Sequence, residues 1–441
     1  MGLLRQSANT LASRMFITLV SIPTGMILAR KLGPEGQGIY TSAITYPGLW
    51  AGFGLLGLDA AHLFFVSRDR RDLGPVVVNS GIVFLFMLAV LLPAYLLLIQ
   101  PILGEKGAVL APFLLVSSAV VPLMVGHHLM LGLFLGLGRV ERYNTWIALS
   151  RVILLALLAV GLLFCGGRTR FAVASYAISL LLFLIASVLW LVRYLTAEDR
   201  GRLRFSPGLL GHSLTYGLKG HLGSILTQFT NRFDTVLIFR WLDAAALGYY
   251  AIAVGLAEKL SLLTTSVQFV LFPRIAAARR EEADRITPMV CRNTFWWMAA
   301  GGLVMFGLGR FLIRLFYSSR FLPALQAFQV LLPGIVFLTF SGLLYSDFSG
   351  RNRRFLPTVA MFIAFLVNLG LNFLWIRRFG IVGAALASTV AYTTQSLIMA
   401  IFFWRVTGIS PLRLIIPERR DLAMYKGLRD KIAARLPASR R

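Results

Sequence analysis

The chain has 441 residues, of which 57% are hydrophobic and 14% are charged, and its mean hydropathy is +0.75. A soluble protein would carry about 25% charged residues, so the composition excludes an ordinary soluble domain. The net charge of +26 does not indicate binding of nucleic acid, because the basic residues are spread over short loops and the C-terminal tail.

Twelve apolar segments follow one another along the chain, and each reaches the roughly 20 residues that a membrane-spanning helix needs. Their apolar runs are continuous, whereas the strands of a membrane barrel alternate apolar and polar residues. The sequence therefore predicts an all-α polytopic membrane protein. The expected spans are 10–30, 39–64, 76–99, 109–136, 145–165, 171–193, 216–239, 246–272, 290–316, 324–346, 355–376 and 380–404.

The loops between these spans carry unequal numbers of basic residues. One set of alternate loops holds sixteen arginines, and the opposite set holds nine lysines and arginines. Because the more basic loops stay on the cytoplasmic side, both termini are expected in the cytoplasm of a protein in the cell (inner) membrane. The outer loops are short, which leaves no room for an outer domain.

An internal repeat relates the two halves of the chain. Residues 27–40 fall on residues 237–250 at an offset of 210, with Arg, Leu, Gly and Tyr coinciding. Both halves hold an even number of spans, so they form a parallel repeat with a substrate path between them. The predicted division is an N-terminal six-helix bundle, a cytoplasmic linker, a C-terminal six-helix bundle and a basic tail, at 1–194, 195–215, 216–405 and 406–441.

The tail is strongly basic. Apolar residues recur at helical spacing from Tyr425 to Leu436, between lysines and arginines. This pattern is typical of an amphipathic helix on an anionic membrane surface, and a solvated tail is the alternative.

Polar residues form matching stripes on the first predicted helix of each half. Ionisable groups inside a span are costly and therefore point to function. In the first half the stripe is Arg14, Thr18, Ser21 and Thr24, and the offset of 210 places these on Ser224, Gln228, Asn231 and Asp234.

The cations near these stripes suit an anionic substrate group such as a pyrophosphate, because arginine forks match phosphate oxygens and lysine supplies a point charge. Internal neutralisation by Asp234 or Glu258 is the equally open alternative. The predicted substrate-binding residues are Arg14, Thr18, Ser21, Gln228, Asn231, Arg232 and Lys259.

Three carboxylates are candidates for ion coupling, namely Asp234, Glu258 and Asp59. Asp59 lies one helical turn from His62, which is compatible with a proton-coupling pair or with a structural hydrogen bond.

Motifs of catalysis are missing from the sequence. It contains no Walker loop, HExxH, GxSxG or CxxC, so we expect no enzymatic activity, no catalytic residue, no metal site and no cofactor. The driving force for any transport must then come from an ion gradient or from substrate supply.

Several segments resemble motifs of polysaccharide transporters of the O-antigen flippase type. They are residues 29–40 (ARKLGPEGQGIY), Arg232-Phe233-Asp234, 247–251 (LGYYA), 272–275 (FPRI) and 380–387 (GIVGAALA). The order and spacing of these segments carry the resemblance, which extends to about residue 405.

This family belongs to the multidrug/oligosaccharidyl-lipid/polysaccharide superfamily. The resemblance implies two six-helix bundles around a V-shaped cavity, as in multidrug (MATE-type) exporters. It also implies the function, which is translocation of a polyprenyl-pyrophosphate-linked oligosaccharide to the outer leaflet for surface polysaccharide biosynthesis. Membrane lipids, a glycan polymerase and glycosyltransferases are the expected partners of a monomer.

Three other functions compete with this interpretation. A cation-coupled multidrug exporter would use cavity carboxylates such as Asp234 and Glu258. A polytopic ligase or glycosyltransferase would need a larger extramembrane loop than the sequence offers. A lipid II flippase would be expected to add two C-terminal helices.

Overall fold

The computed structural model describes residues 2–353, 355–418 and 421. Within these residues it is almost entirely helical and contains no β-strand, so the prediction of an all-α chain is confirmed. The predicted amphipathic helix from Tyr425 to Leu436 lies outside the described residues.

The helices follow the order of the predicted spans. They are α1 (Gly2–Leu55), α2 (Leu58–Arg68), α3 (Leu73–Leu103), α4 (Gly107–Leu110), α5 (Leu114–Gly136), α6 (Val140–Ala159), α7 (Thr169–Tyr194), α8 (Ala197–Gly201), α9 (Pro207–Trp241), α10 (Ala244–Ala257), α11 (Leu262–Ala277), α12 (Arg280–Phe316), α13 (Ala324–Gly350) and α14 (Phe355–Thr407).

Seven helical stretches within the described residues are long and apolar enough to cross a membrane. Some exceed a single crossing, because 70–136 contains 67 residues and 355–407 contains 53. A crossing takes about 20 residues, so such stretches contain more than one span. The chain is therefore a multi-pass membrane protein, and the number of twelve spans stays a prediction.

Two glycines divide the longest helices at the boundaries of predicted spans. Gly33 in α1 has φ 69° and lies between the predicted spans 10–30 and 39–64, and Gly380 in α14 has φ 59° and is the first residue of the predicted span 380–404. Side chains with a Cβ disfavour positive φ, so glycine is the residue that permits these sharp bends. At about 1.5 Å per residue, the 54-residue α1 would far exceed the thickness of a bilayer if it were straight.

The contacts divide the chain into two units, which we describe separately. The first unit contains 1–256, 308–331 and 365–388, and the second contains 257–307, 332–364 and 389–441. The first unit thus holds the whole first repeat together with α9 and parts of later helices. The predicted division into two six-helix bundles is a different partition and stays a prediction.

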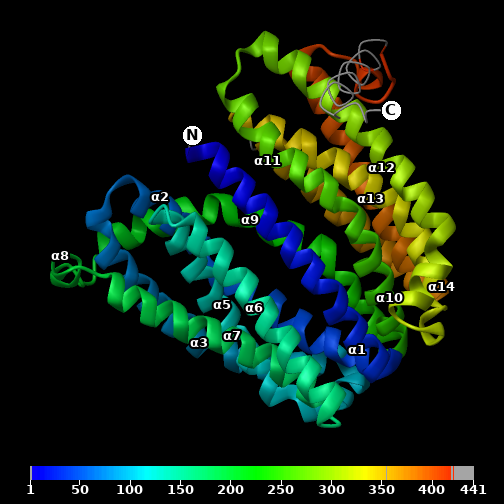
Figure 1. The fold of residues 1–441 in the computed structure, drawn as a ribbon, viewed down its shortest axis with the longest axis horizontal. Coiled ribbons are helices and arrows are strands. Elements are labelled where there is room, and N and C mark those ends of the chain that lie inside the picture. The colour runs from blue at the N-terminus through cyan, green and yellow to red at the C-terminus, as the bar shows by residue number, and fades with distance from the viewer. Residues whose placement is uncertain (1, 354, 419–420, 422–441) are drawn as a thin grey trace, which may run out of the picture. The chain divides into compact units, whose positions relative to one another are not determined.

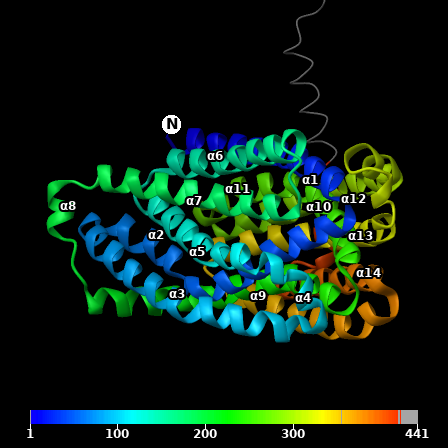
Figure 2. The same cartoon turned by 90° about the horizontal axis from the view of Figure 1, so that it is seen from below.

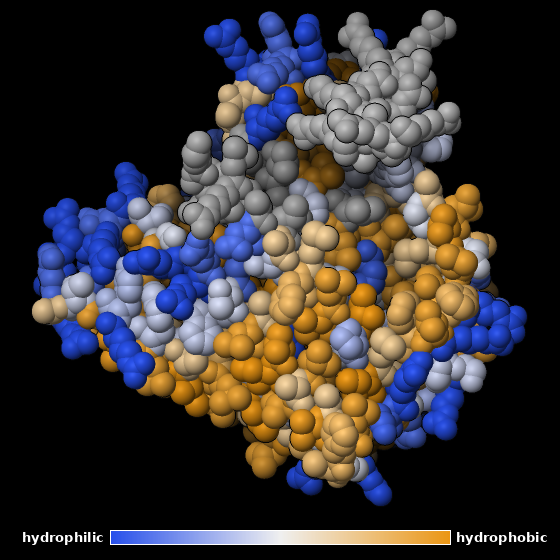
Figure 3. Space-filling model, viewed as in Figure 1, coloured by the Kyte–Doolittle hydropathy of each residue, from blue (hydrophilic) through white to orange (hydrophobic). Residues whose placement is uncertain are grey.

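In the first unit, α1, α5, α6 and α7 pack side by side (Figures 1 and 2). Their buried contact includes Leu28, Val120, Leu158 and Val173. Many apolar side chains on the other faces of these helices are exposed, as Leu115 and Leu182 are. Figure 3 shows apolar residues over this region and hydrophilic residues gathered at its α8 end. Exposed apolar faces are expected where lipid replaces water, since packing rather than the hydrophobic effect holds such helices together.

The connection between α7 and α9 is fixed by an ion pair. Arg70 contacts the Asp199 carboxylate at 3.0 Å, and Thr196 and Asp199 cap α8 reciprocally. The hydrogen bond from Arg70, followed by those from the Thr196 amide and hydroxyl, lowers the pKa of Asp199 to about 2. Part of the predicted linker 195–215 is therefore ordered, and α9 already begins at Pro207 after Ser206, a pairing typical of helix starts.

We expect acid to loosen this connection. Because the folded-state pKa of Asp199 is lowered, its stabilising contribution is present above the unfolded pKa of about 3.9 and is lost as the pH falls toward 2. Pepsin cleavage within 195–206 should therefore increase between pH 4 and pH 2. In Asp199→Asn, cleavage should already be high at pH 4, and a wild-type pH profile in that variant would contradict the assignment.

The second unit has its own core and an ionic network beside it. Leu271, Phe340, Leu343 and Phe403 are buried there together. Its α12 also holds the segment after α14, because buried Arg292 bonds Asp421 at 2.7 Å.

The ionic network is centred on Arg351, directly after α13. Its Nε donates to the fully buried Asp347 carboxylate at 2.7 Å, and its Nη1 lies 2.8 Å from Asp284 as an ion pair. Thr287 donates a further hydrogen bond to Asp347 at 2.6 Å, and the guanidinium lies 5.8 Å from the Phe403 ring centroid. Arg351 therefore ties α12 to α13 and lies over α14.

Candidate functional site

The polar stripe of the first predicted span lies on α1. Thr18 donates to the carbonyl of Arg14 at 3.0 Å, Ser21 to that of Thr18 at 2.7 Å, and Thr24 to that of Val20 at 2.8 Å. These hydroxyls satisfy their donors within the helix, which makes them tolerable in lipid. Their oxygens can still accept hydrogen bonds from a substrate.

The matching stripe lies on α9, in the same unit. Gln228 donates to the Gly48 carbonyl of α1 at 2.8 Å, and a Cβ on Gly52 would lie 2.5 Å from the Gln228 Oε1. Gln228 therefore fixes α9 closely against α1. Asn231 and Arg232 are half-buried on α9.

Asp234, also on α9, is 2% exposed, and its carboxylate accepts hydrogen bonds from several neighbouring groups. The Thr235 amide donates to Oδ1 at 2.7 Å, and the Tyr250 hydroxyl of α10 donates to Oδ2. Ser388 of α14 lies 3.5 Å from the same oxygen. Arg232 interacts with this carboxylate electrostatically, which is consistent with the internal-neutralisation alternative.

Two asparagines of α14 extend this cluster. Asn368 donates to the Ser388 hydroxyl at 3.4 Å, and Asn372 donates to Asn368 Oδ1 at 2.9 Å. The Asn372 Oδ1 is buried and has no hydrogen-bond partner among the described residues. Buried polar atoms are normally paired, so an oxygen without a partner, linked to a buried carboxylate through Asn368 and Ser388, is suited to a proton carrier or a small cation.

We call Asp234, Tyr250, Asn368, Asn372 and Ser388 the Asp234 cluster. The sequence pointed to Asp234 but not to the other four residues. A usable signal was present, because Asn368 and Asn372 lie one helical turn apart in an otherwise apolar span.

Asp59 and His62 lie on α2, which packs closely against α5. A Cβ on Gly132 would lie 2.5 Å from the Asp59 carbonyl, and one on Gly136 would lie 2.6 Å from that of His62. This glycine pair, four residues apart, allows close helix contact. The His62 ring bonds the Leu129 carbonyl at 3.1 Å and the Ser80 hydroxyl at 2.5 Å, and it interacts with Asp59 electrostatically.

Glu258 and Lys259 belong to the second unit and lie on a 3-10 turn, Glu258–Ser261, between α10 and α11. The predicted span 246–272 is therefore interrupted at its two charged residues. Ser261 donates to the Glu258 carbonyl at 2.7 Å within this turn. Such mid-helix interruptions often mark functional segments.

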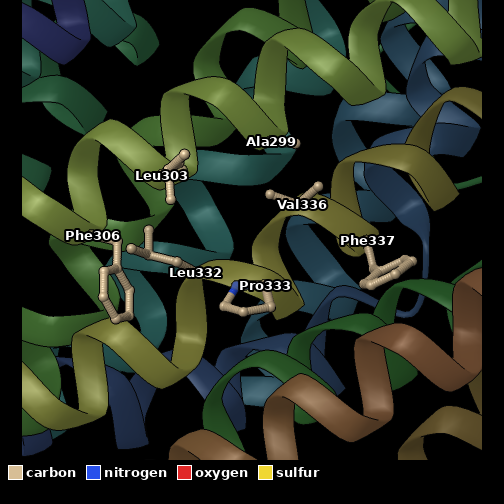
Figure 4. Close-up of a pocket in the computed structure, with 8 residues that line it drawn as sticks. Ala299, Leu303, Phe306, Leu332, Pro333, Val336 and Phe337 are labelled. Atoms are coloured by element: carbon tan, nitrogen blue, oxygen red, sulfur yellow. The ribbon is translucent and has the colours of Figure 1, made fainter. Parts of the chain in front are cut away.

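The second unit also contains an apolar cavity of about 280 Å³ between α12 and α13 (Figure 4). Leu303 and Phe306 of α12 face Leu332 and Val336 of α13 across it. Because apolar side chains line it, this cavity suits a hydrocarbon chain and not a sugar or a phosphate.

The sequence profile of a family described as polysaccharide biosynthesis protein matches residues 3–279, which is more than half of the chain. A protein of Shigella flexneri named "Putative O-antigen transporter" is 19% identical over 424 residues, covering 93% of this chain and 99% of the relative. An uncharacterized membrane protein of Methanocaldococcus jannaschii is 22% identical over 395 residues, covering 83% of this chain and 77% of the relative.

Solved structures of two kinds share the fold. The lipid II flippase MurJ in an inward closed conformation matches with a TM-score of 0.76 and 15% identity, over 92% of this chain and 88% of that structure. An inward-facing MATE multidrug resistance transporter matches with a TM-score of 0.72 and 16% identity, over 91% and 98%.

These relatives bear on the class of the protein. The matches with an assigned activity are transporters or flippases, and the fold is that of the multidrug/oligosaccharidyl-lipid/polysaccharide superfamily. None of these transporters and flippases is described as an enzyme. With its profile match over 3–279, the chain belongs to the polysaccharide biosynthesis protein family.

Proposed function

We propose that this protein translocates a polyprenyl-pyrophosphate-linked oligosaccharide from the cytoplasmic to the outer leaflet, for surface polysaccharide biosynthesis. The family match over residues 3–279 carries the proposal. The relative named as an O-antigen transporter, which aligns along nearly its whole length, supports the substrate class.

The sequence repeat supports alternating access as the mechanism. Parallel repeats pack about an axis along the membrane normal and rock against each other around a central path. We place the protein in the inner membrane with both termini on the cytoplasmic side, since the more basic loops lie on that side. The protein would act as a monomer that receives its substrate from glycosyltransferases and delivers it to a glycan polymerase.

The polar stripes on α1 and α9 are the proposed contact for the substrate head group. Arg14 and Arg232 offer positive charge to the pyrophosphate, while Gln228 and Asn231 offer hydrogen bonds to it or to the sugar. Lys259, which belongs to the second unit, is a separate candidate for binding the substrate. The position equivalent to Arg232 in the first half is Ile22, which carries no charge. The second half would therefore supply most of the positive charge that binds the pyrophosphate.

Asp234 is the proposed ion-coupling residue, with Asp59 and Glu258 as further candidates. The Asp234 cluster combines a buried carboxylate, two hydroxyls and an amide oxygen that has no hydrogen-bond partner in the described part of the chain. Binding and release of a proton or a monovalent cation there would change the charge of α9 itself. That helix also carries Arg232, so the change would reach the substrate contact.

The test uses purified protein in lipid vesicles that contain a fluorescent polyprenyl-pyrophosphate oligosaccharide. Protein-dependent exposure of the sugar to an added lectin is the expected result. The same vesicles would be tested for uptake of a lipophilic cation, because a multidrug exporter shares this fold. Cation transport without sugar translocation would reject the proposal in favour of the exporter.

Reversal of charge at Arg232 tests the substrate contact. Arg232→Glu should insert normally and slow translocation roughly tenfold, because it places a negative charge beside a pyrophosphate. Arg170→Glu changes an exposed arginine in the first turn of α7 by the same charge and serves as the matched control. Full activity of Arg232→Glu in the vesicle assay would remove Arg232 from the site.

A further inference from the structure

Two arginines at equivalent positions of the repeat each reach the end of a helix from the other half of the sequence. Arg30 donates from Nε to the Phe316 carbonyl at 3.3 Å and from Nη2 to the Leu315 carbonyl. Arg240 donates from Nη1 to the Pro101 carbonyl at 3.1 Å and also to that of Ile102.

The targets of these arginines are equivalent as well. Leu315 and Phe316 end α12, and Pro101 and Ile102 lie in the last turn of α3. These helices correspond to the third predicted span of each half. The last carbonyls of a helix lack partners within the helix and carry partial negative charge, so a guanidinium is a favourable cap.

A second pair of reciprocal contacts joins the backbones of α1 and α10, close in sequence to the two arginines. A Cβ on Gly38 would lie 1.7 Å from the Ala244 carbonyl oxygen, and one on Gly248 would lie 1.9 Å from that of Pro34. The offset of 210 converts the first contact into the second. Only glycine permits this approach, so backbone crosses backbone at both positions.

All these residues belong to the first unit, which contains the first repeat and the parts of α12 and α14 nearest this crossing. The arginines lie at the ends of predicted spans that the charge bias assigns to the outer side. The contacts therefore join the outer ends of the two repeats, and no contact between the two units is involved.

We infer that Arg30 and Arg240 act as a paired clasp, which keeps the outer ends of the two repeats closed around the Gly38–Gly248 crossing. The inference rests on the alternating access of the proposed function. Separation of the repeats at this end must break both caps, because each guanidinium and its carbonyls belong to different repeats. The glycine crossing, which has no side chains to disengage, is the pivot.

The clasp is tested by labelling a cysteine from outside. Thr24→Cys lies on the α1 stripe, on the cytoplasmic side of Arg30 by the predicted orientation, and would be made in a Cys165→Ser background because Cys165 is exposed. A membrane-impermeant maleimide is added to intact cells. Arg30→Ala and Arg240→Ala should each raise the labelling rate roughly five- to tenfold, and the double variant should raise it further.

Lys31→Ala is the matched control, because it removes one positive charge from an exposed residue next to Arg30. Arg30→Lys and Arg240→Lys keep the charge but cannot span two carbonyls, so intermediate labelling is expected. Melting temperatures of the purified variants, close to that of the parent, would exclude unfolding as the cause.

Two outcomes would overturn the clasp. One is a double alanine variant labelled as slowly as its parent, and the other is a Lys31→Ala variant labelled as fast as Arg30→Ala. Labelling requires no substrate, so a failed sugar-translocation assay would reject the proposed function while leaving this result unaffected.

Discussion

An Asp234→Asn variant should reach the membrane in normal amounts and translocate substrate no faster than vesicles without protein. Asparagine keeps the size of the side chain and can still accept the hydrogen bond from the Thr235 amide. The Tyr250 hydroxyl can accept from the new amide group instead of donating. What the variant loses is the negative charge, so it can neither take up a proton nor neutralise the charge of a bound cation.

Translocation driven by an imposed proton or sodium gradient, in the vesicle assay, measures this effect. Asp243→Asn is the matched control, because Asp243 accepts the Ala246 amide at 2.7 Å at the exposed start of α10. It should transport normally. Full gradient-driven transport by Asp234→Asn would show that the cluster has only a structural role.

An Arg351→Ala variant should lose about 2–4 kcal/mol of stability. The side chain is 11% exposed and pairs with Asp347, whose side chain is fully buried. Removal of one partner from a buried ion pair leaves the other charge without compensation, which costs more than the pair itself contributes.

Thermal unfolding of the purified protein, followed by tryptophan fluorescence, measures this loss. Arg353→Ala is the matched control, since Arg353 is two residues away and exposed. Adding Asp347→Asn to Arg351→Ala should restore part of the stability by removing the uncompensated charge. Equal melting temperatures of Arg351→Ala and Arg353→Ala would contradict the network.

Much of the fold could be predicted because its determinants are local. Gly33 and Gly380 bend their helices at the boundaries of predicted spans, and α3 matches the predicted span 76–99 closely. Helix α12 ends with the predicted span 290–316 but begins ten residues earlier. Other features escaped prediction. The interruption at Glu258–Ser261 and the end of α1 near Leu56 both fall inside segments that hydropathy marks as continuous.

Less of the candidate site than of the fold could be predicted from the sequence. A carboxylate in an apolar segment stands out, so Asp234 was found, but Ser388 and Tyr250 resemble ordinary span residues. The offset of 210 aligned Arg30 with Arg240 and Gly38 with Gly248, yet gave no indication that each contacts the other half.

The sequence by itself determined that the chain is a helical membrane protein with a parallel repeat and the motifs of a polysaccharide transporter. It could do so because lipid requires apolar runs of a fixed length, and because repeats and motifs are linear patterns. Only the tertiary structure decided which helices contact one another. Lipid-facing and protein-facing sides of a span are both apolar, so hydropathy cannot tell them apart. The partners of Asp234, Arg351 and the two clasp arginines come from distant helices and appear only when those helices are packed.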